Sequence, residues 1–510
     1  MSNPAKLYSG ELDGIDAKII EVEVDINVGL HSFNIVGLAD KALTEAKERV
    51  NSAIKNSGAK PPNKENRRIT VNLAPADIKK TGSQYDLAIA AGYMLATKQI
   101  SPFDSADKIF AGELALDGSL RPISGALNIA EAALKNGFKY LLLPRENAAE
   151  ASVIEKIKVI PATSLAQVIS FLEGRDNIVP YKSSRADGEQ VYPVDFAAVK
   201  GQENAKRALS IAAAGSHNLL FVGPPGAGKS LMAQAIISIL PDLTTGESIE
   251  ITKVWSAAGL VKSGLIKLRP FRSPHHSTST VAVVGGGSNP KPGEISLAHR
   301  GILFLDELPE FRRDILEALR QPLESGEVYI SRAKSSLVFP SKFTLIAAMN
   351  PCPCGYFGDP ERECRCTANE VFRYQKKISG PLLDRIDLQV TVPRLDIQEL
   401  RAKKRDGADS SSIRHKVAAA REIQSDRFKK FKIPIYTNSE MTSEQCDNLI
   451  ELNHESEEFL KTALESTFIS ARGYYRTLKV ARTIADLSES DDVKKEHLAE
   501  AFGYRMRQKE

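Results

Sequence analysis

Cysteine is scarce in this 510-residue sequence, which contains five cysteines. Four of them, Cys352, Cys354, Cys364 and Cys366, lie within fifteen residues, whereas Cys446 stands alone. A secreted disulfide framework would spread its cysteines through a small domain. The distribution therefore excludes that class and favours a reduced compartment and a metal.

Long hydrophobic runs are also missing. The longest apolar stretches, such as residues 86–96, are too short and too interrupted to span a membrane. The first seventeen residues, MSNPAKLYSGELDGIDA, lack the apolar core of a signal peptide. We therefore expect a cytoplasmic protein without membrane association.

An excess of charge of either sign is absent, because 68 basic and 64 acidic residues leave a formal charge of +4. This balance makes no global case for nucleic acid, so a nucleic-acid surface would have to be local. The 42% hydrophobic and 26% charged residues exclude a wholly disordered, collagen-like or coiled-coil chain. At roughly 100–200 residues per domain, the length suggests about three domains.

Residues 1–175 alternate between strand and helix patterns. Residues 17–24 and 69–73 are typical of strands, whereas 41–55 and 87–96 have helical spacing. This alternation indicates an α/β or α+β domain.

The rest of the chain divides into three stretches. Residues 176–194 are polar and contain two prolines, which indicates a linker. Residues 195–394 have the helix, strand and glycine-loop patterns of a nucleotide-binding α/β domain, and residues 395–510 are mostly helical. The periodic helical segments are 450–466, 474–487 and 492–507.

A phosphate-binding loop is the clearest motif. The apolar strand 219–222 runs into GPPGAGKS, and a helix follows. Glycines let successive backbone N–H groups point at phosphate, and the helix N-terminus adds partial positive charge. Lys229 would contact the β- and γ-phosphates of ATP, and Ser230 would bind Mg²⁺. The nucleotide-binding residues are Gly223, Pro224, Pro225, Gly226, Ala227, Gly228, Lys229 and Ser230.

Three polar residues follow two later apolar strands. Asp306 and Glu307 come after residues 302–305, and Asn350 comes after 343–349. Since the carboxyl ends of parallel strands meet at one edge of a sheet, we expect these residues beside the phosphate loop. Asp306 fits a role at Mg²⁺, and Glu307 fits the base that polarises the attacking water. Asn350 could hydrogen-bond the γ-phosphate or that water.

The motifs GPPGAGKS, LFLDE, AAMN, LLDRID and SARG together resemble AAA+ ATPases of the magnesium-chelatase-like family. The longer phrases PGEISLAHRGILFLDELPEF, ISRAKSSLVFPSKFTLIAAMNPCPCGYFGD and ARTIADL are most similar to its competence protein ComM (YifB) group. The resemblance covers almost the whole chain. It implies an α/β fold with a Lon-protease-like (ribosomal S5 domain 2-like) domain at 1–175, an AAA+ P-loop domain at 195–394 and a helical lid at 395–510.

The resemblance also implies a ring. Arg385 occupies the position of the arginine finger, which acts in a neighbouring subunit's site, so a homo-hexamer is expected. A local ion pair of Arg385 with Asp384 or Asp387 is the alternative. Arg472 matches the sensor-2 position, with Arg476 as the competing candidate.

The family resemblance also implies roles for the segment around Gln202 and for a glycine-rich loop. Gln202 belongs to the segment VKGQENAKRAL, which packs near the adenine in these proteins. The stretch containing Gly285–Gly287 matches a loop that faces the pore of the ring, although a plain surface loop is the alternative. His275 and His276 are expected to point apart, as structural or polar contacts rather than metal ligands.

A hairpin is predicted at 327–340, with Val328–Ser331 pairing with Ser336–Phe339. Arg332 and Lys334 lie at its tip, and six copies would give a basic collar of roughly twelve charges that can follow a phosphate backbone. The alternative is a solvated hairpin tip.

The spacing C-x-C-x9-C-x-C departs from the usual zinc knuckle. Four thiols on one short segment nevertheless suit tetrahedral coordination, so a structural Zn²⁺ is the favoured interpretation. Free thiols and an iron–sulfur or redox site remain open.

Proteolysis is not expected from the Lon-like region, because that chemistry needs a serine nucleophile and a lysine base. The aligned positions hold Gln84 (with Ser83 one residue away) and Asn128. The function that the family resemblance implies is a hexameric ATP-dependent motor on single-stranded and branched DNA, acting in branch migration during natural transformation or recombination. A chelatase-type ATPase that drives metal insertion into a tetrapyrrole is the alternative.

Overall fold

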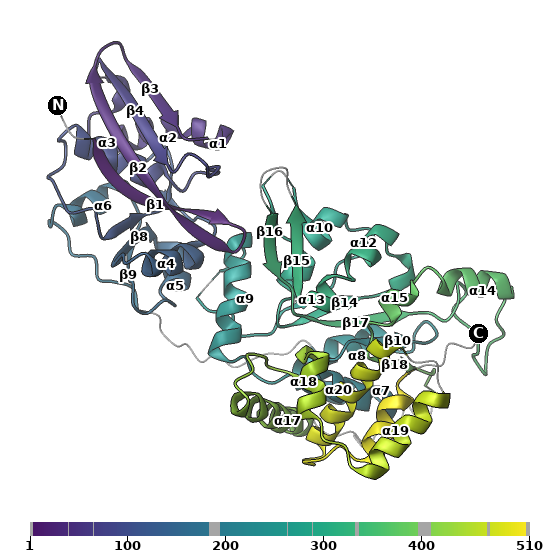
Figure 1. The fold of residues 1–510 in the computed structure, drawn as a ribbon. Coiled ribbons are helices and arrows are strands. Elements are labelled where there is room, and N and C mark those ends of the chain that lie inside the picture. The colour runs from purple at the N-terminus through teal and green to yellow at the C-terminus, as the bar shows by residue number, and fades with distance from the viewer. Residues whose placement is uncertain are drawn as a thin grey trace.

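The computed structural model describes residues 4–38, 40–64, 66–182, 194–262, 264–287, 289–331, 336–395, 410–466 and 470–505. Figure 1 shows an N-terminal unit, a central unit around a parallel sheet, and a group of C-terminal helices packed against it. Within those ranges, no helix has both the length and the apolar character that a membrane crossing requires.

The N-terminal unit contains a four-stranded sheet in the order β1-β2-β4-β3. β1 (Ala5–Asp13), β2 (Asp16–Val28) and β4 (Arg67–Ala74) pair antiparallel, and β3 (Ser32–Val36) pairs parallel to β4. A three-stranded parallel sheet has the order β5-β8-β9. Its strands are β5 (Lys108–Phe110), β8 (Tyr140–Pro144) and β9 (Lys158–Ala162). A separate short hairpin consists of β6 (Glu113–Leu114) and β7 (Leu120–Arg121).

Helices cover these sheets with their apolar faces. The segment 41–55, predicted as one helix, is divided at Glu45 into two. The buried face of the second contains Val50 and Ile54, as the spacing predicts. The helices are α1 (Lys41–Thr44), α2 (Ala46–Asn56), η1 (Pro62–Lys64), α3 (Asp86–Ala96), α4 (Ala126–Lys135), η2 (Arg145–Asn147), α5 (Ala148–Ala151) and α6 (Leu165–Leu172).

The central unit is organised by a five-stranded sheet in the order β11-β14-β17-β10-β18. Every pairing in it is parallel. Strands buried on both faces need continuous apolar sequence, which the segments ILFL and TLIAAM supply. The strands are β10 (Leu219–Val222), β11 (Phe271–Arg272), β14 (Ile302–Leu305), β17 (Thr344–Met349) and β18 (Leu388–Thr391).

Helices surround this sheet, and several are only one turn long. They are η3 (Phe196–Ala198), α7 (Glu203–Gly215), α8 (Lys229–Ala235), η4 (Ile236–Ile239), α9 (Thr245–Ala258), α10 (Thr280–Val284), α11 (Glu294–Leu297), η5 (Leu308–Glu310), α12 (Arg313–Ala318), α13 (Pro322–Ser325), α14 (Ala368–Gln375) and α15 (Gly380–Leu383).

Two small hairpins project from the central unit. β15 (Glu327–Ser331) pairs with β16 (Ser336–Pro340), which confirms the predicted hairpin. Its tip, with Arg332 and Lys334, lies outside the described residues. β12 (Gly285–Gly286) pairs with β13 (Lys291–Pro292), and a Cβ atom on Gly285 would lie 3.2 Å from Ile330 Cδ1. The two hairpins therefore pack against each other.

The C-terminal helices share a hydrophobic core with the central sheet. That core includes Phe221 and Val390 from the strands and Val417, Leu478 and Ala481 from the helices. The helices are α17 (Ser410–Lys430), η6 (Asn438–Glu440), α18 (Ser443–Leu449), α19 (His454–Ser466), α20 (Ala471–Leu487) and α21 (Lys495–Gly503). The helix predicted from residue 450 thus begins at His454.

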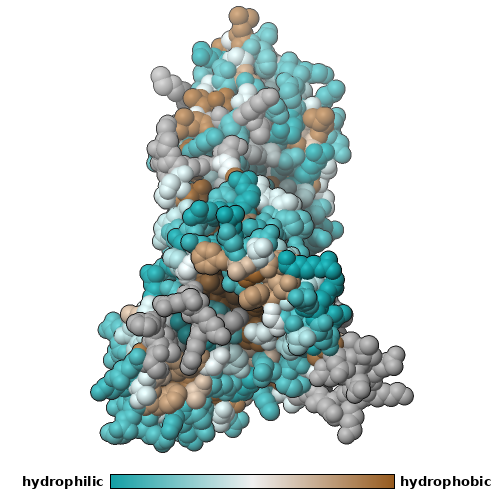
Figure 2. Space-filling model, turned by 90° about the vertical axis from the view of Figure 1, so that its right-hand side faces the viewer, coloured by the Kyte–Doolittle hydropathy of each residue, from teal (hydrophilic) through white to brown (hydrophobic). Residues whose placement is uncertain are grey.

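The N-terminal unit contacts the central unit through α4 and α9. Lys253 on α9 pairs with Glu131 on α4 at 2.7 Å, and the Gly125 N–H donates to the Ser256 carbonyl oxygen at 2.8 Å. The side of the molecule drawn in Figure 2 is mostly hydrophilic, with a recess near its middle lined by hydrophobic surface.

Candidate functional site

The phosphate loop begins where β10 ends. A Cβ atom on Gly223 would lie 2.2 Å from the carbonyl oxygen of Val392, the residue that follows β18, so glycine is required for the loop to pack there. Gly226 and Gly228 have φ angles of +81° and +83°, which favour glycine. A Cβ atom at either position would meet nothing within 4 Å. The loop therefore presents open backbone of the kind that surrounds a polyphosphate.

Lys229 is buried inside this loop. Its Nζ donates to the Gly223 and Pro224 carbonyl oxygens at 2.6 and 2.8 Å and to Asn350 Oδ1 at 3.0 Å. Burial lowers the pKa of Lys229, and the charges of Asp306 and Glu307 oppose that shift. Lys229 and Asn350, predicted from separate motifs, thus meet at one point.

Ser230 and Asp306 form a second pair beside the loop. The Ser230 hydroxyl donates to Asp306 Oδ2 at 2.6 Å. A hydroxyl and a carboxylate in contact provide the oxygen ligands that Mg²⁺ prefers next to a phosphate group. These two residues fit the ion that the sequence predicts.

Glu307 follows Asp306 in an unusual backbone conformation, with φ 51° and ψ 48°. Left-handed conformations of non-glycine residues are costly and are found preferentially at functional sites. Its side chain is 56% exposed, and one carboxylate oxygen lies 3.8 Å from His276 Nδ1.

The prediction that His275 and His276 point apart is wrong. Their ring centroids lie 4.0 Å apart, with an interplanar angle of 35°. The alternation expected on a strand or helix does not apply because the pair lies after β11 has ended, in irregular backbone that follows Pro274. His276 consequently faces Glu307.

Arg385 lies at the opposite edge of the sheet from Lys229. It precedes β18, whose first residue Leu388 pairs with Leu219, the first residue of β10. The phosphate loop follows the last residue of β10, and the two ends of this four-residue strand lie about 10 Å apart. Within one chain, Arg385 and the phosphate loop therefore face different edges.

One carboxylate holds both the predicted arginine finger and the predicted sensor-2 arginine. Glu324 on α13 pairs with the Arg385 guanidinium, and its Oε1 accepts a hydrogen bond from Arg472 at 2.8 Å. The hydrogen bond from Arg385 lowers the pKa of Glu324. The alternative pairs of Arg385 with Asp384 or Asp387 are not formed. Instead Arg385 Nη1 donates to the Pro381 carbonyl oxygen at 2.6 Å.

Arg476 is engaged in a buried ion pair. It donates to Asp387 Oδ1 at 2.6 Å and to the Arg385 carbonyl oxygen at 2.8 Å. Burial alone would raise the pKa of Asp387, but Arg476 and His217 hold it well below its usual range. The Arg476 side chain is 19% exposed, whereas that of Arg472 is 58% exposed. The geometry therefore favours Arg472 over Arg476 as a group that reaches outward.

These arginines line a groove between the amino edge of the sheet and the C-terminal helices. Eight basic and four acidic side chains line it, so its field attracts anions. The basic residues are Arg269, Arg300, Lys342, Arg385, Arg421, Arg472, Arg476 and Lys479. The acidic ones are Glu247, Glu324, Asp387 and Glu440.

Gln202 lies at the start of α7 with φ 58°. Its Nε2 donates to the Pro393 carbonyl oxygen at 2.7 Å, which ties the helix to the segment after β18. The predicted adenine contact of Gln202 stays a prediction.

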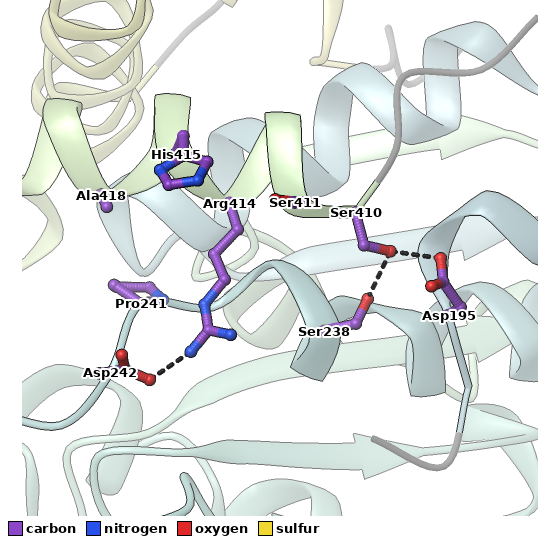
Figure 3. A pocket seen from close by; sticks show the side chains of 9 residues that line it. All are labelled: Asp195, Ser238, Pro241, Asp242, Ser410, Ser411, Arg414, His415 and Ala418. Carbon is purple, nitrogen blue, oxygen red and sulfur yellow. Dashed lines mark hydrogen bonds and ion pairs between the residues drawn. The ribbon is translucent and has the colours of Figure 1, made fainter. Parts of the chain in front are cut away.

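A separate crevice lies between η4 and α17 (Figure 3). Arg414 pairs with Asp242 on one side, and Ser410 contacts Ser238 and Asp195 on the other. None of the site residues predicted from the sequence lines it. It is the joint between the central unit and the C-terminal helices.

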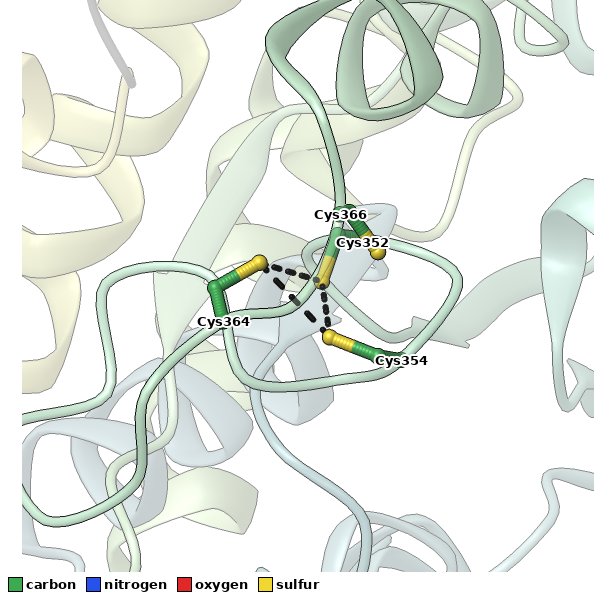
Figure 4. Close-up of side chains that lie close together, drawn as sticks. All are labelled: Cys352, Cys354, Cys364 and Cys366. Atoms are coloured by element: carbon green, nitrogen blue, oxygen red, sulfur yellow. Dashed lines mark hydrogen bonds between the residues drawn. The ribbon is translucent and has the colours of Figure 1, made fainter.

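The four clustered cysteines converge directly after Asn350 (Figure 4). Their sulfur atoms all lie within 4.8 Å of one another, and none forms a disulfide. Cys352 Sγ lies 3.4 Å from Cys354 Sγ and 3.7 Å from Cys364 Sγ, and the latter two are 3.6 Å apart. Backbone N–H groups of Tyr356 and Arg365 lower the pKa of Cys354 to about 6.

The two positions aligned with a Lon-type dyad serve other contacts. Asn128 Nδ2 donates to the Ile15 carbonyl oxygen at 2.5 Å and to the Lys253 carbonyl oxygen at 3.2 Å. Gln84 Nε2 donates to Glu11 Oε2 at 2.8 Å. Asn128 therefore joins the β1–β2 turn to α9 of the central unit.

Sequence reasoning missed Glu324. It named Asp387 and His276 but not their observed partners, which are Arg476 and Glu307. No local sequence pattern marks Glu324, because it meets Arg385 and Arg472 only through the packing of α13 beside them.

Comparison with known proteins gives three family matches. The profile for magnesium chelatase subunit ChlI matches residues 195–400, that for subunit ChlI of Mg-chelatase matches 22–147, and that for the ChlI C-terminal region matches 407–505. Competence protein ComM of Haemophilus influenzae is 44% identical, over 98% of this chain and 97% of its own length. The uncharacterized protein YifB of Escherichia coli is 42% identical, over 96% and 95%. The magnesium-chelatase 38 kDa subunit of Rhodobacter capsulatus is 26% identical, over 46% and 71%.

Proposed function

Because the chain belongs to the magnesium-chelatase ChlI-type ATPase family, together with competence protein ComM and YifB, we propose that it is an ATP-driven DNA motor. Its work would be strand separation or branch migration when incoming DNA is integrated, in natural transformation or recombination. The name and near full-length match of the ComM relative support this assignment over other ATPase functions.

The observation that carries the proposal is the division of charged groups between two sheet edges. Lys229, Asp306 and Glu307 gather at the carboxyl edge, whereas Arg385 and Arg472 lie at the amino edge, about 10 Å away along β10. An arginine that stabilises the transferred phosphoryl group must touch it. The amino edge of one copy therefore faces the nucleotide of the next.

Contacts of this head-to-tail type generate a closed ring when the rotation between copies closes. The ring we propose is the hexamer that the family resemblance implies. Within it, Lys229 and the loop bind the phosphates, Ser230 and Asp306 hold Mg²⁺, and Glu307 orients the attacking water. Arg385 and Arg472 of the neighbour supply positive charge where negative charge develops.

DNA contact is assigned to the hairpin β15–β16. Its strands are formed as the sequence predicts, and the glycine hairpin β12–β13 packs against it. Arg332 and Lys334 at the tip would place a ring of positive charge around the axis. Such charge binds a phosphate backbone without reading the base sequence.

Tetrapyrrole metallation, the alternative, has weaker support. The magnesium-chelatase subunit matches only 46% of this chain, whereas ComM matches 98%. The N-terminal unit is proposed to be a Lon-like fold without protease activity, because Gln84 and Asn128 cannot replace a serine nucleophile and a lysine base. Both side chains instead form hydrogen bonds within the fold.

Two metals complete the proposal. Mg²⁺ accompanies ATP, and the four clustered cysteines hold one structural Zn²⁺. Tetrahedral zinc with Zn–S bonds of about 2.3 Å places its sulfur ligands about 3.8 Å apart. The three sulfur distances of 3.4, 3.6 and 3.7 Å approach that geometry. They exceed the S–S bond of about 2.05 Å in a disulfide.

The test is ATP-dependent strand separation on labelled forked and four-way DNA. We expect the wild-type protein to move the branch point and the Lys229→Ala variant to leave the DNA unchanged. A hexameric preparation that hydrolyses ATP but never separates strands would contradict the motor.

A further inference from the structure

We propose that the four-cysteine zinc site acts as a clamp on the phosphate loop, so that nucleotide affinity depends on the bound zinc. The inference rests on the zinc site proposed above and extends it to a role in ATP binding.

The first contact of the clamp is with the phosphate loop itself. The Gly355 N–H donates to the Cys352 carbonyl oxygen at 3.0 Å, which closes a tight turn around Cys354. Gly355 has φ +86°, and a Cβ atom there would lie 2.6 Å from Pro225 Cδ. The cysteine turn thus rests directly on Pro225 of the phosphate loop.

The second contact runs through Asn350. Cys352 follows Asn350 after one proline, and Asn350 accepts the hydrogen bond from Lys229 at 3.0 Å. Helix α14, which follows Cys366, returns to this segment through Gln375, whose Nε2 donates to the Pro351 carbonyl oxygen at 2.9 Å. The cysteines therefore join strand β17 to α14 and to the phosphate loop.

The segment has few other means of holding its shape. Between residues 352 and 367, Cys352 and Gly355 are buried, and the remaining residues are partly or fully exposed. A stretch with so little buried apolar surface depends on a cross-link, and metal binding in such loops supplies folding free energy. The Phe357 N–H that donates to Cys352 Sγ at 3.3 Å is a donor that stabilises a thiolate ligand.

The chain offers a matched pair of variants that separates the clamp from the zinc. Gly355 and Gly358 lie in the same loop with φ +86° and +78°, so an alanine strains both backbones alike. A Cβ atom at Gly355 strikes Pro225, whereas at Gly358 it meets nothing within 4 Å. Both variants leave all four cysteines in place.

The experiment measures zinc per chain by mass spectrometry and the Kd for mant-ADP, on full-length protein purified without chelator. We expect about one zinc per chain in the wild type and in both glycine variants. Gly355→Ala should weaken mant-ADP binding about tenfold relative to Gly358→Ala, because the phosphate loop is displaced. Releasing the zinc with an organomercurial should weaken binding similarly, and dithiothreitol with Zn²⁺ should restore it, whereas dithiothreitol with a chelator should not.

Fewer than half an equivalent of zinc per chain would overturn the metal site and the clamp with it. Zinc-loaded protein whose mant-ADP affinity stays within twofold after zinc release would overturn the clamp alone, as would equal affinities of the two glycine variants. These measurements use no DNA, so a failure of strand separation with zinc-dependent nucleotide binding would count against the motor and leave the clamp standing.

Discussion

At the carboxyl edge of the central sheet Lys229 is buried and bonded to its own loop, whereas at the amino edge Arg472 is exposed and held by Glu324. The first edge contains the groups that we propose to bind phosphate, metal and water. The second holds two guanidinium groups on a single carboxylate: that of Arg472 is exposed, whereas that of Arg385 is buried. In the function that we propose, each chain therefore carries a binding half and an activating half of one site, directed away from each other.

Loss of Lys229, at the carboxyl edge, should have the largest effect on nucleotide binding and hydrolysis. Lys229→Ala removes the charge that contacts the phosphates, so we expect mant-ATP affinity to fall about 100-fold and hydrolysis to vanish. Isothermal titration and phosphate release measure the two effects. The matched change at the amino edge, Arg472→Ala, should leave the affinity of the isolated chain within a factor of about two.

Loss of Arg385 should separate binding from hydrolysis. Arg385→Ala should lower kcat about 1,000-fold, because the guanidinium stabilises charge only in the transition state. Nucleotide affinity should hardly change. The exposed Arg175, which pairs with Glu173 in the N-terminal unit, provides the control Arg175→Ala. If Arg385→Ala lost nucleotide binding as Lys229→Ala does, the two edges would not be distinct.

Glu324 sharpens the comparison further. Glu324→Gln removes the charge that holds Arg385 and Arg472 together, so we expect kcat to fall about fivefold while nucleotide affinity is kept. Glu327→Gln is the control, because Glu327 bonds the exposed Tyr329 hydroxyl and neither arginine. An unchanged kcat for Glu324→Gln would show that the arginines need no such support.

The smallest effect is expected at the contact between the N-terminal and central units. Asn128→Ala removes hydrogen bonds to the Ile15 and Lys253 carbonyls, which should cost about 1–2 kcal/mol in the free energy of unfolding. Urea denaturation measures this change. Asn136→Ala, at the end of the same helix, loses a single bond, to the Ala132 carbonyl oxygen, and should cost less. Equal losses would mean that Asn128 does not join the two units.

The carboxyl edge could be predicted from the sequence because its signals are local. Buried parallel strands need unbroken apolar runs, and each site residue follows such a run directly, as Asp306 follows ILFL. The order of the strands then brings Lys229 and Asn350 within 3.0 Å.

The amino edge was less accessible to sequence reasoning. Glu324 sits in a one-turn helix, and its two arginine partners come from distant segments.

Strand β1 of the N-terminal unit was also missed, because Ser9 and Gly10 interrupt its apolar pattern. The structure gives the reason for that glycine: a Cβ atom on Gly10 would lie 2.8 Å from Ile129 of α4. Tertiary packing determines both the position of Glu324 beside the arginines and the glycine in β1, and no local sequence pattern indicates either.

Subunit mixing tests most directly whether the two edges serve one site in neighbouring copies. Arg385→Ala retains the carboxyl edge and Glu307→Gln retains the amino edge, so each variant alone should be inactive. In equal mixtures that form mixed rings, verified by energy transfer between labelled chains, about a quarter of the contacts combine two intact edges. The account predicts recovery of roughly a quarter of wild-type hydrolysis. Mixed rings that remain as inactive as either variant would contradict it.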